Sequence, residues 1–309
     1  MRRGLSASGF SNNTHIFTDS PIGAGRTNMI DIEHLQTWIG REQRRSEILS
    51  PFPAKALSAL LERSGFPREG HPLPPLWHWL YFLEAPLETG TDGHPRRGDF
   101  LPPVPLPRRM WAGGSLDILR PLRLGAAAEK LTLVRSVELK SGKSGELVFV
   151  NLEHRLSQAG HPCILEEQNL VYREMPAGPA ALPAGEPAST TCEWSRTVRP
   201  DPVLLFRFSA LTYNGHRVHY DRDYATQEEF YSGLVVHAPL LATLLLDLLL
   251  RERPEMEFSH FRFRALRPTF DCGLVELRAK REGRTVKFWS ADHENYIGMN
   301  ATATIDGAT

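Results

Sequence analysis

The segment LTYNGHRVHYDRDYA runs from Leu211 to Ala225, and GLVVHAPLLATLLLDLLL follows it from Gly233 to Leu250. The first segment gathers two His, one Asn, two Asp, two Arg and three Tyr. The second is apolar on all sides over about five turns, which predicts a helix buried all round. Polar, titratable groups are costly to bury without partners or a task. We therefore expect an active-site loop that leads into the central helix of the fold.

A helix followed by strands is the pattern on either side of this loop, and it occurs twice. Helices are expected at 31–43 and 53–64, and a short buried helix, or alternatively a buried strand, at 74–83. Strands are expected after them near 116–119, 130–139, 147–154 and 163–172. Later in the chain, a strand region at 194–208 and a helix from Pro239 to about Arg251 precede strands at 257–266, 273–281, 285–292 and 296–305.

The repeat is weak but recognisable in the sequence. LDILRPLR, from Leu116, matches HFRFRALR, from His260, and each opens a run of strands. The pattern predicts two α+β units, each with an antiparallel sheet wrapped on a helix, although other α+β folds share it. We expect a disordered tail at 1–28, a weak transit peptide being the alternative, then a first domain at 29–174. A linker at 175–191 and a second domain at 192–309 complete the chain.

The stretch 85–114 is rich in Pro, Gly and Arg, which argues against regular structure there. It also contains Phe100, Leu101, Val104, Leu106, Met110 and Trp111. Disordered segments are poor in such residues, and a long loop inside a domain is usually functional. We therefore expect this loop to fold back over another part of the protein.

The order Asn214-Gly-His216-Arg-Val-His219, then Tyr224-Ala225, Gly233 and His237-Ala238-Pro239, resembles the hydration motif of MaoC-like enoyl-thioester hydratases and dehydratases. That motif reads Asp-x-Asn-x-x-His, with a His-Gly at the start of the next helix. Asn214 stands at its Asp, His216 at its Asn, His219 at its His and Ala238 at its Gly. This variant is most similar to the branch with mesaconyl-C4-CoA (itaconyl-CoA) hydratases and type 2 hydroxyacyl-thioester dehydratases.

The resemblance implies a fold and a reaction. The fold is the double hot-dog, in which a degenerate first half makes room for the acyl chain. The reaction is reversible hydration of an enoyl-CoA thioester, with mesaconyl-C4-CoA or itaconyl-CoA giving citramalyl-CoA. A 3-hydroxyacyl-thioester dehydratase of fatty-acid synthesis, acting on acyl-carrier-protein or CoA esters, is the alternative. A non-catalytic module that only binds acyl-CoA is another, because an amide replaces the motif's carboxylate at Asn214.

His219 is the candidate base, as a neutral imidazole near neutral pH. Asn214 is expected to position the water or the base, since an amide donates and accepts hydrogen bonds but takes no proton. Either His219 works alone, or His216 or Asp221 joins it. For Asp221 we favour a cap or an ion pair with a neighbouring arginine such as Arg217, at the edge of the substrate site.

Backbone N–H groups at the start of the Pro239 helix are the natural oxyanion hole, because a helix N-terminus presents unpaired donors. Proline has no N–H, so the expected donors are Gly233, Val236 and Ala238, and His237 is expected only to cap the helix. Arg108, Arg109 and Arg217, with Trp111 beside them, are candidates to bind a free carboxylate or the phosphates of the substrate.

The composition argues against nucleic-acid-binding, membrane and disulfide-rich proteins. Zero net charge argues against general attraction to nucleic acid or membranes, and no apolar run reaches the length of a membrane span. Three scattered cysteines fit a reducing cytosol. We find no cluster of metal ligands and no phosphate-binding loop, so neither a metal nor a cofactor is expected. Exposed strand edges make a homodimer possible.

Overall fold

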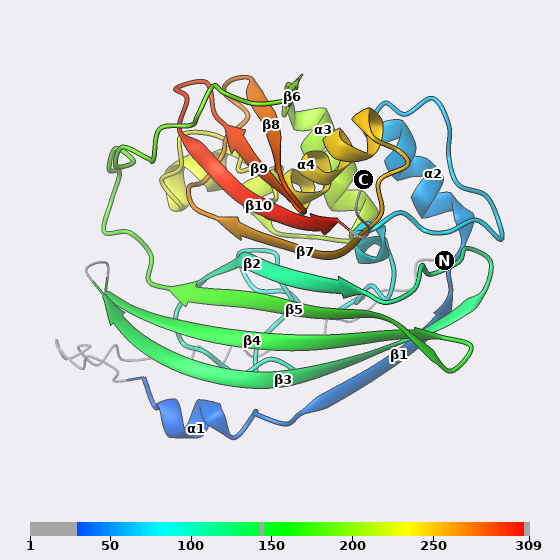
Figure 1. The fold of residues 1–309 in the computed structure, drawn as a ribbon. Coiled ribbons are helices and arrows are strands. Elements are labelled where there is room, and N and C mark those ends of the chain that lie inside the picture. The colour runs from blue at the N-terminus through cyan, green and yellow to red at the C-terminus, as the bar shows by residue number, and fades with distance from the viewer. Residues whose placement is uncertain (1–29, 143–144, 306–309) are drawn as a thin grey trace, which may run out of the picture. The chain divides into compact units, whose positions relative to one another are not determined.

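Ten antiparallel strands form one sheet in the order β1-β3-β4-β5-β2-β7-β10-β9-β8-β6 (Figure 1). The computed structural model describes residues 30–142 and 145–305, so the expected tail at 1–28 lies outside the described residues. The strands are β1 Glu42–Ile48, β2 Arg108–Ile118, β3 Ala127–Gly142, β4 Gly145–Gln158, β5 His161–Arg173, β6 Trp194–Val198, β7 Phe258–Ala265, β8 Val275–Glu282, β9 Thr285–Ala291 and β10 Ile297–Ile305. The helices are α1 Ile32–Gln36, α2 Pro51–Leu60, α3 Pro202–Leu211 and α4 Ala238–Glu252, with short turns η1 Trp77–Leu80, η2 Arg217–His219 and η3 Tyr224–Glu228.

The two halves of the sheet repeat one topology about its centre. Counted outward from the middle, the first half runs β2-β5-β4-β3-β1 and the second β7-β10-β9-β8-β6. The two inner strands pair directly, with Leu116 opposite Phe261 and Asp117 opposite His260. These are the strands that the internal repeat aligned, so the prediction of two α+β units with antiparallel strands is confirmed. Residues 175–191 join the halves without a helix or strand, and the domain boundaries placed around them stay predictions.

Helix α4 is the central helix of the second half. Every residue from Leu240 to Leu249 is buried, and the helix packs against β6, β8, β9 and β10. A helix whose sequence is apolar on all sides therefore lies where none of its faces is exposed to water. The expected helix from Pro239 to about Arg251 is confirmed. None of the helices in the part of the chain that the structure describes is both long and apolar enough to cross a membrane.

At the corresponding place in the first half there is only the 3-10 turn η1, so the short buried helix expected at 74–83 is limited to one turn at 77–80. Leu76 has φ of 69° and Phe82 has φ of 58°, and an α-helix accommodates neither conformation. Trp77, His78 and Leu80 are nevertheless buried, as the apolar pattern predicted. Because a single turn covers less of the sheet than α4 does, the inner face of β3, β4 and β5 remains available to line a cavity.

Two other expectations about helices and strands need correction. Helix α1 ends at Gln36, and the rest of the expected helix at 31–43 is replaced by a turn at Gly40 and strand β1. The strand region expected at 194–208 ends at Val198, and α3 follows. Its start is fixed by Asp201, whose carboxylate accepts the Leu204 N–H at 2.8 Å, and by a proline in the first turn.

The loop expected at 85–114 is shorter than the composition suggested. Strand β2 begins at Arg108, so residues 108–114 are regular structure, contrary to the expectation from their composition. Gly113 and Gly114 lie in the centre of the sheet, where added Cβ atoms would lie 2.5 Å from the Phe263 carbonyl oxygen and 2.3 Å from the Glu167 carbonyl oxygen. These glycines therefore permit the close approach of the neighbouring strands β7 and β5 to β2, rather than interrupting β2.

Candidate active site

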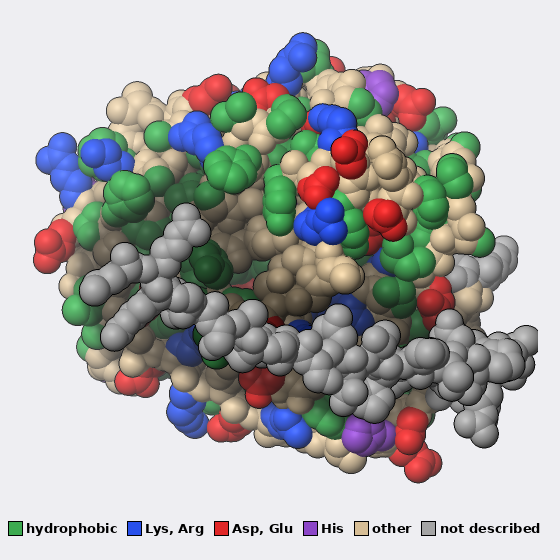
Figure 2. All heavy atoms as spheres, turned by 180° about the vertical axis from the view of Figure 1, so that it is seen from behind, with side chains coloured by type: hydrophobic (Ala, Val, Ile, Leu, Met, Phe, Trp, Pro, Cys, Tyr) green, Lys and Arg blue, Asp and Glu red, His purple; other side chains and the backbone are tan. Residues whose placement is uncertain are grey.

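A cavity of about 1090 Å³ is lined by the inner face of the first half of the sheet and by the segment that follows α3. Its sheet wall carries Lys130, Thr132, Leu152, His154, Glu166, Gln168 and Leu170, and its aromatic wall carries Trp79, Tyr81, Phe82 and Trp111. Its polar end carries Arg109, His94, Ser209, Asn214 and His216, next to Pro239 of α4. The face turned to the viewer in Figure 2 is hollowed, with hydrophobic side chains around the hollow. A largely apolar cavity with a few convergent polar groups is typical of a small-molecule site.

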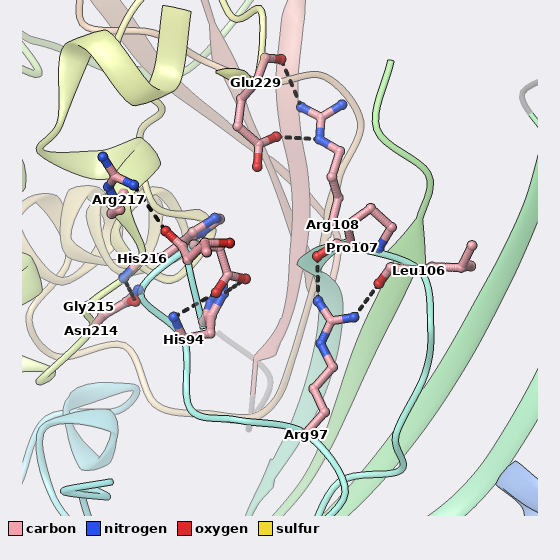
Figure 3. A network of polar contacts seen from close by, with 12 residues as sticks. His94, Arg97, Leu106, Pro107, Arg108, Asn214, Gly215, His216, Arg217 and Glu229 are labelled. Atoms are coloured by element: carbon pink, nitrogen blue, oxygen red, sulfur yellow. Dashed lines mark hydrogen bonds and ion pairs between the residues drawn. The ribbon is translucent and has the colours of Figure 1, made fainter. Parts of the chain in front are cut away.

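Asn214 shapes the loop that leaves α3. Its N–H donates to the Ser209 carbonyl at 2.8 Å, and its side-chain oxygen accepts the His216 N–H at 3.0 Å (Figure 3). This is the short-range turn that asparagine side chains favour. The preceding residue, Tyr213, has φ of 49°, which completes the reversal of the chain. The loop thus turns Asn214 and His216 back to the cavity.

His219 is buried beside this polar end and is not among the residues that line the cavity. Its Nδ1 lies 2.7 Å from the Val235 carbonyl oxygen, which can only accept, so Nδ1 carries the hydrogen and Nε2 keeps a lone pair. Burial lowers the pKa of His219 to about 4. The ring is therefore neutral at pH 7 and has the protonation state of a base.

His237 lies at the N-cap position of α4, but its side chain makes no capping hydrogen bond, contrary to expectation. Its ring stacks on His219 with centroids 3.6 Å apart, and its Nε2 lies 2.8 Å from the Ser209 hydroxyl oxygen. Burial and then the charge of a protonated His219 hold the pKa of His237 well below its usual range. His237 thus supports the ring of His219 from the side of the central helix.

His94 and Asp92 complete the polar end, and sequence analysis missed both. They come from the Pro-rich loop of the first half, and the His94 ring lies 4.1 Å from the His216 ring (Figure 3). The Asp92 carboxylate lies 2.9 Å from Nδ1 of His94. Burial and then the charge of Arg109 lower the pKa of His94 to about 4. For Asp92 burial raises the pKa, but the hydrogen bond and charge of His94 outweigh it and bring the value to about 2.

Asp92, His94 and His216 also offer three possible metal-ligand atoms within 4.8 Å of one another. Two imidazoles and a carboxylate suit a transition metal. The hydrogen bond between Asp92 and His94 gives the same side chains a second use, as an acid–base pair. The only sequence signal for this group was a loop longer than a connection requires.

The expected oxyanion donors differ in their surroundings. The Val236 N–H donates to the Thr269 carbonyl at 2.8 Å and is engaged in the fold. Among the described residues, the N–H groups of Gly233 and Ala238 have no assigned acceptor. Ala238 opens α4 next to Pro239, which lines the cavity. The Ala238 N–H is therefore the donor best placed to meet a carbonyl oxygen there.

The expected substrate-binding arginines are separated by the structure. Arg108 is buried, pairs with the Glu229 carboxylate at 2.5 Å and does not line the cavity (Figure 3). Arg217 pairs with Asp221 at 2.7 Å and borders a smaller, neighbouring cavity. Arg109 lines the main cavity, and among the described residues no hydrogen bond or ion pair is assigned to it.

Trp111 is a wall of the main cavity. Its ring lies edge-on to Trp79 with centroids 4.9 Å apart, and its N–H donates to the Gly113 carbonyl at 3.0 Å. The indole is therefore held in place and presents a rigid apolar surface next to Arg109.

The family model of hydroxyacyl-thioester dehydratase type 2 matches residues 76–271. The chain is 44% identical to the mesaconyl-C(4)-CoA hydratase of Chloroflexus aurantiacus over 278 residues, which cover 87% of this chain and 97% of that protein. The chain belongs to this family of MaoC-like hydratases and dehydratases. It is also 29% identical to the mitochondrial hydroxyacyl-thioester dehydratase type 2 of Schizosaccharomyces pombe, over 64% of this chain and 74% of that protein. The chain is accordingly a hydro-lyase, as the sequence predicted.

Solved structures with low identity show the same fold. A MaoC-like dehydratase from Phytophthora capsici aligns with a TM-score of 0.64 at 14% identity, covering 91% of this chain and all of that one. HtdX of Mycobacterium tuberculosis aligns with a TM-score of 0.60 at 13% identity, covering 85% of this chain and 99% of that one. The α+β double hot-dog expected from the sequence is confirmed.

Proposed function

We propose that this enzyme catalyses the reversible hydration of an enoyl-CoA thioester, with mesaconyl-C4-CoA or itaconyl-CoA as substrate and citramalyl-CoA as product. The observation that carries the proposal is the cavity, whose polar end holds Asn214 and His216 of the hydration motif next to the start of α4. The name of its relative at 44% identity supports the choice of a C5 diacid.

Arg109 gives a physical reason to favour a diacid. It faces a cavity with mostly apolar walls, and among the described residues no ion pair or hydrogen bond is assigned to its guanidinium, although its charge helps to lower the pKa of Asp92. A guanidinium in such surroundings gains most from a carboxylate on the ligand, because the carboxylate forms charge-assisted, bidentate hydrogen bonds with it. The free carboxylate of a mesaconyl group would supply that partner, whereas a plain enoyl chain would not.

The reaction needs a polarised thioester carbonyl and an activated water. The Ala238 N–H at the start of α4 stabilises the charge that develops on the carbonyl oxygen. The water oxygen bonds to the β-carbon, the electron pair of the double bond moves towards the carbonyl, and a proton is delivered to the α-carbon. We assign the Nε2 lone pair of His219 to this water, which it holds by accepting a hydrogen bond, while Asn214 orders the loop beside it.

The first experiment is to follow the loss of enoyl-thioester absorbance with mesaconyl-C4-CoA and crotonyl-CoA side by side. Faster turnover of the diacid supports the proposal, and replacing His219 by Ala should lower kcat by about a hundredfold or more. Preference for crotonyl-CoA would point instead to the dehydratase of fatty-acid synthesis. Tight binding of both esters without turnover would identify a non-catalytic acyl-CoA-binding module. A cytosolic location and a homodimer stay predictions from the sequence.

A further inference from the structure

The family's motif uses a carboxylate and an imidazole together, and this chain has an amide in place of the carboxylate. Asn214 cannot accept a proton, and its side-chain oxygen is already engaged by the His216 N–H at 3.0 Å. The motif's Asp position therefore holds no group that accepts a proton from water. The structure contains such a group close by, on a different part of the chain.

That group is carried by a small hairpin at 88–96. Thr89 pairs with Pro95, and the Gly90 N–H donates to the His94 carbonyl at 2.8 Å. The Asp92 carboxylate accepts the His94 N–H at 3.0 Å, which fixes the tip of the hairpin. The two side chains are thus held by local hydrogen bonds rather than carried on an unstructured loop.

The hairpin is docked on the hydration motif. The Arg217 N–H donates to the Asp92 carbonyl at 2.9 Å, and the Arg217 guanidinium donates to the Thr91 carbonyl at 3.1 Å. The backbones of Gly93 and Gly215 meet so closely that an added Cβ on Gly93 would lie 1.9 Å from the Gly215 carbonyl oxygen. Contacts of this kind fix the hairpin against the motif and hold the His94 ring against that of His216 (Figure 3).

We propose that His94, oriented by Asp92, is a catalytic residue that takes over the proton-accepting position which Asn214 cannot fill. This inference rests on the hydration reaction proposed above. The Asp92 carboxylate accepts the hydrogen on Nδ1 of His94, so the lone pair lies on Nε2. His94 lines the cavity, so this imidazole is accessible to the attacking water.

The step balances with two neutral imidazoles. The water donates one hydrogen bond to Nε2 of His94 and one to Nε2 of His219, and its oxygen bonds to the β-carbon; the hydrogen that faces His219 stays on that oxygen. The O–H bond that points at His94 breaks and its proton binds Nε2 of His94, while the electrons of the double bond move to the thioester as an enolate. The same proton then leaves Nε2, and the enolate electrons form the new C–H bond at the α-carbon. Asp92 favours His94 as the acceptor, since a carboxylate stabilises the imidazolium that forms. Asp92 is a positioning residue and touches no substrate.

The test compares His94→Ala, His94→Gly and Asp92→Asn with the wild type, using the substrate that the wild type turns over best. We expect His94→Ala to lower kcat by about 10² to 10⁴, with KM within a few-fold and an unchanged circular dichroism spectrum. Asp92→Asn should lower kcat about tenfold or more, and the double variant Asp92→Asn/His94→Ala should be no slower than His94→Ala alone. Added imidazole should restore part of the activity of His94→Gly, which a purely structural role would not allow.

His161→Gln is the matched control, because this histidine is exposed at the start of β5. A folded His94→Ala variant with kcat within threefold of the wild type would overturn the proposal. So would loss of wild-type activity on treatment with a chelator and its return with one equivalent of a divalent metal, since Asp92, His94 and His216 would then be metal ligands. Failure of the wild type to hydrate any enoyl thioester would instead refute the proposed function itself.

Discussion

Gly93 and Gly215 approach each other so closely that a methyl group on Gly93 would lie 1.9 Å from the Gly215 carbonyl oxygen. The two glycines belong to opposite halves of the double hot-dog, one on the 88–96 hairpin and one inside the hydration motif. Their contact brings Asp92 and His94 to the polar end of the cavity. The second half thus depends on the first for part of its acid–base chemistry as well as for the cavity wall.

Gly93→Ala should separate the hairpin from the motif. A Cβ that meets backbone at this distance forces one segment to shift, and φ of 86° adds the usual cost of a left-handed residue. We expect kcat to fall at least tenfold, because displacement of about 1 Å is enough to spoil a catalytic geometry. Steady-state kinetics with mesaconyl-C4-CoA measure this directly.

Gly98→Ala in the same loop is the matched control. Its φ is 100°, but its Cβ would meet only the Pro103 side chain at an ordinary 3.5 Å. It therefore carries a similar backbone cost without the clash. Equal kcat values for the two variants would show that the glycine contact does not position His94.

The sequence predicted the elements whose pattern is local. Helix α4 was found because its apolar run is long and lies between His237 and Pro254. Strands β8 and β9 could be predicted because Gly283 marks a turn between two runs of strand-like sequence. In the structure Gly283 has φ of 62°, as such a turn requires. The apolar run of α3 has no clear helical period and therefore predicts a strand, although Asp201 before it caps a helix.

The site was harder to predict because its members come from both halves. Nothing near Asp92 and His94 in the sequence indicates that they meet His216, since that contact depends on how the halves pack. Arg108 and Arg109 illustrate a second limit. Neighbouring strand residues face opposite sides, so one arginine is buried against Glu229 and the other faces the cavity. The sequence alone gave no means of choosing between them.

Arg109→Gln should change the choice of substrate. If the guanidinium binds the free carboxylate of a C5 diacid, its loss should raise KM for mesaconyl-C4-CoA by about ten- to a hundredfold, the range expected for a hydrogen bond to a charged group. KM for crotonyl-CoA, which has no free carboxylate, should change little. The ratio of kcat/KM for the two esters is the measurement. Arg44→Gln, at an exposed arginine of β1, is the control, and a parallel loss on both esters would argue for a general structural role of Arg109.

Asp247→Asn should destabilise the fold. This carboxylate is buried on α4 and pairs with Arg63 at 2.5 Å, Arg196 at 3.0 Å and Arg251 at 2.6 Å. The cluster ties the central helix to β6 and to the chain after α2, and removing its anion leaves three cations without their shared partner. Breaking a buried pair in this way costs about 3–5 kcal/mol. Urea unfolding measures the loss, and Asp223→Asn at an exposed aspartate should change the free energy of unfolding by less than about 0.5 kcal/mol.

Low pH should destabilise the protein because its buried histidines are neutral in the folded state. His154 on β4 is the residue at which this effect is tested. Its Nδ1 lies 2.9 Å from the Thr132 hydroxyl and its Nε2 lies 2.8 Å from the Gln168 side-chain oxygen. Each nitrogen of the neutral ring therefore has a hydrogen-bond partner. Burial and then the charge of Lys130 lower the pKa of His154 from 6.5 to about 4. Between these values the unfolded chain binds a proton that the folded protein does not, so stability rises with pH and is lost as the pH falls.

At pH 5 this one residue should cost about 2 kcal/mol relative to pH 7.5. Urea unfolding at the two pH values should therefore show a fall in stability that is about 2 kcal/mol smaller in His154→Gln than in the wild type. The exposed His161→Gln variant should keep the wild-type fall. An unchanged fall in His154→Gln would mean that the ring is protonated in the folded protein, which would place a positive charge on the sheet wall of the cavity beside Lys130.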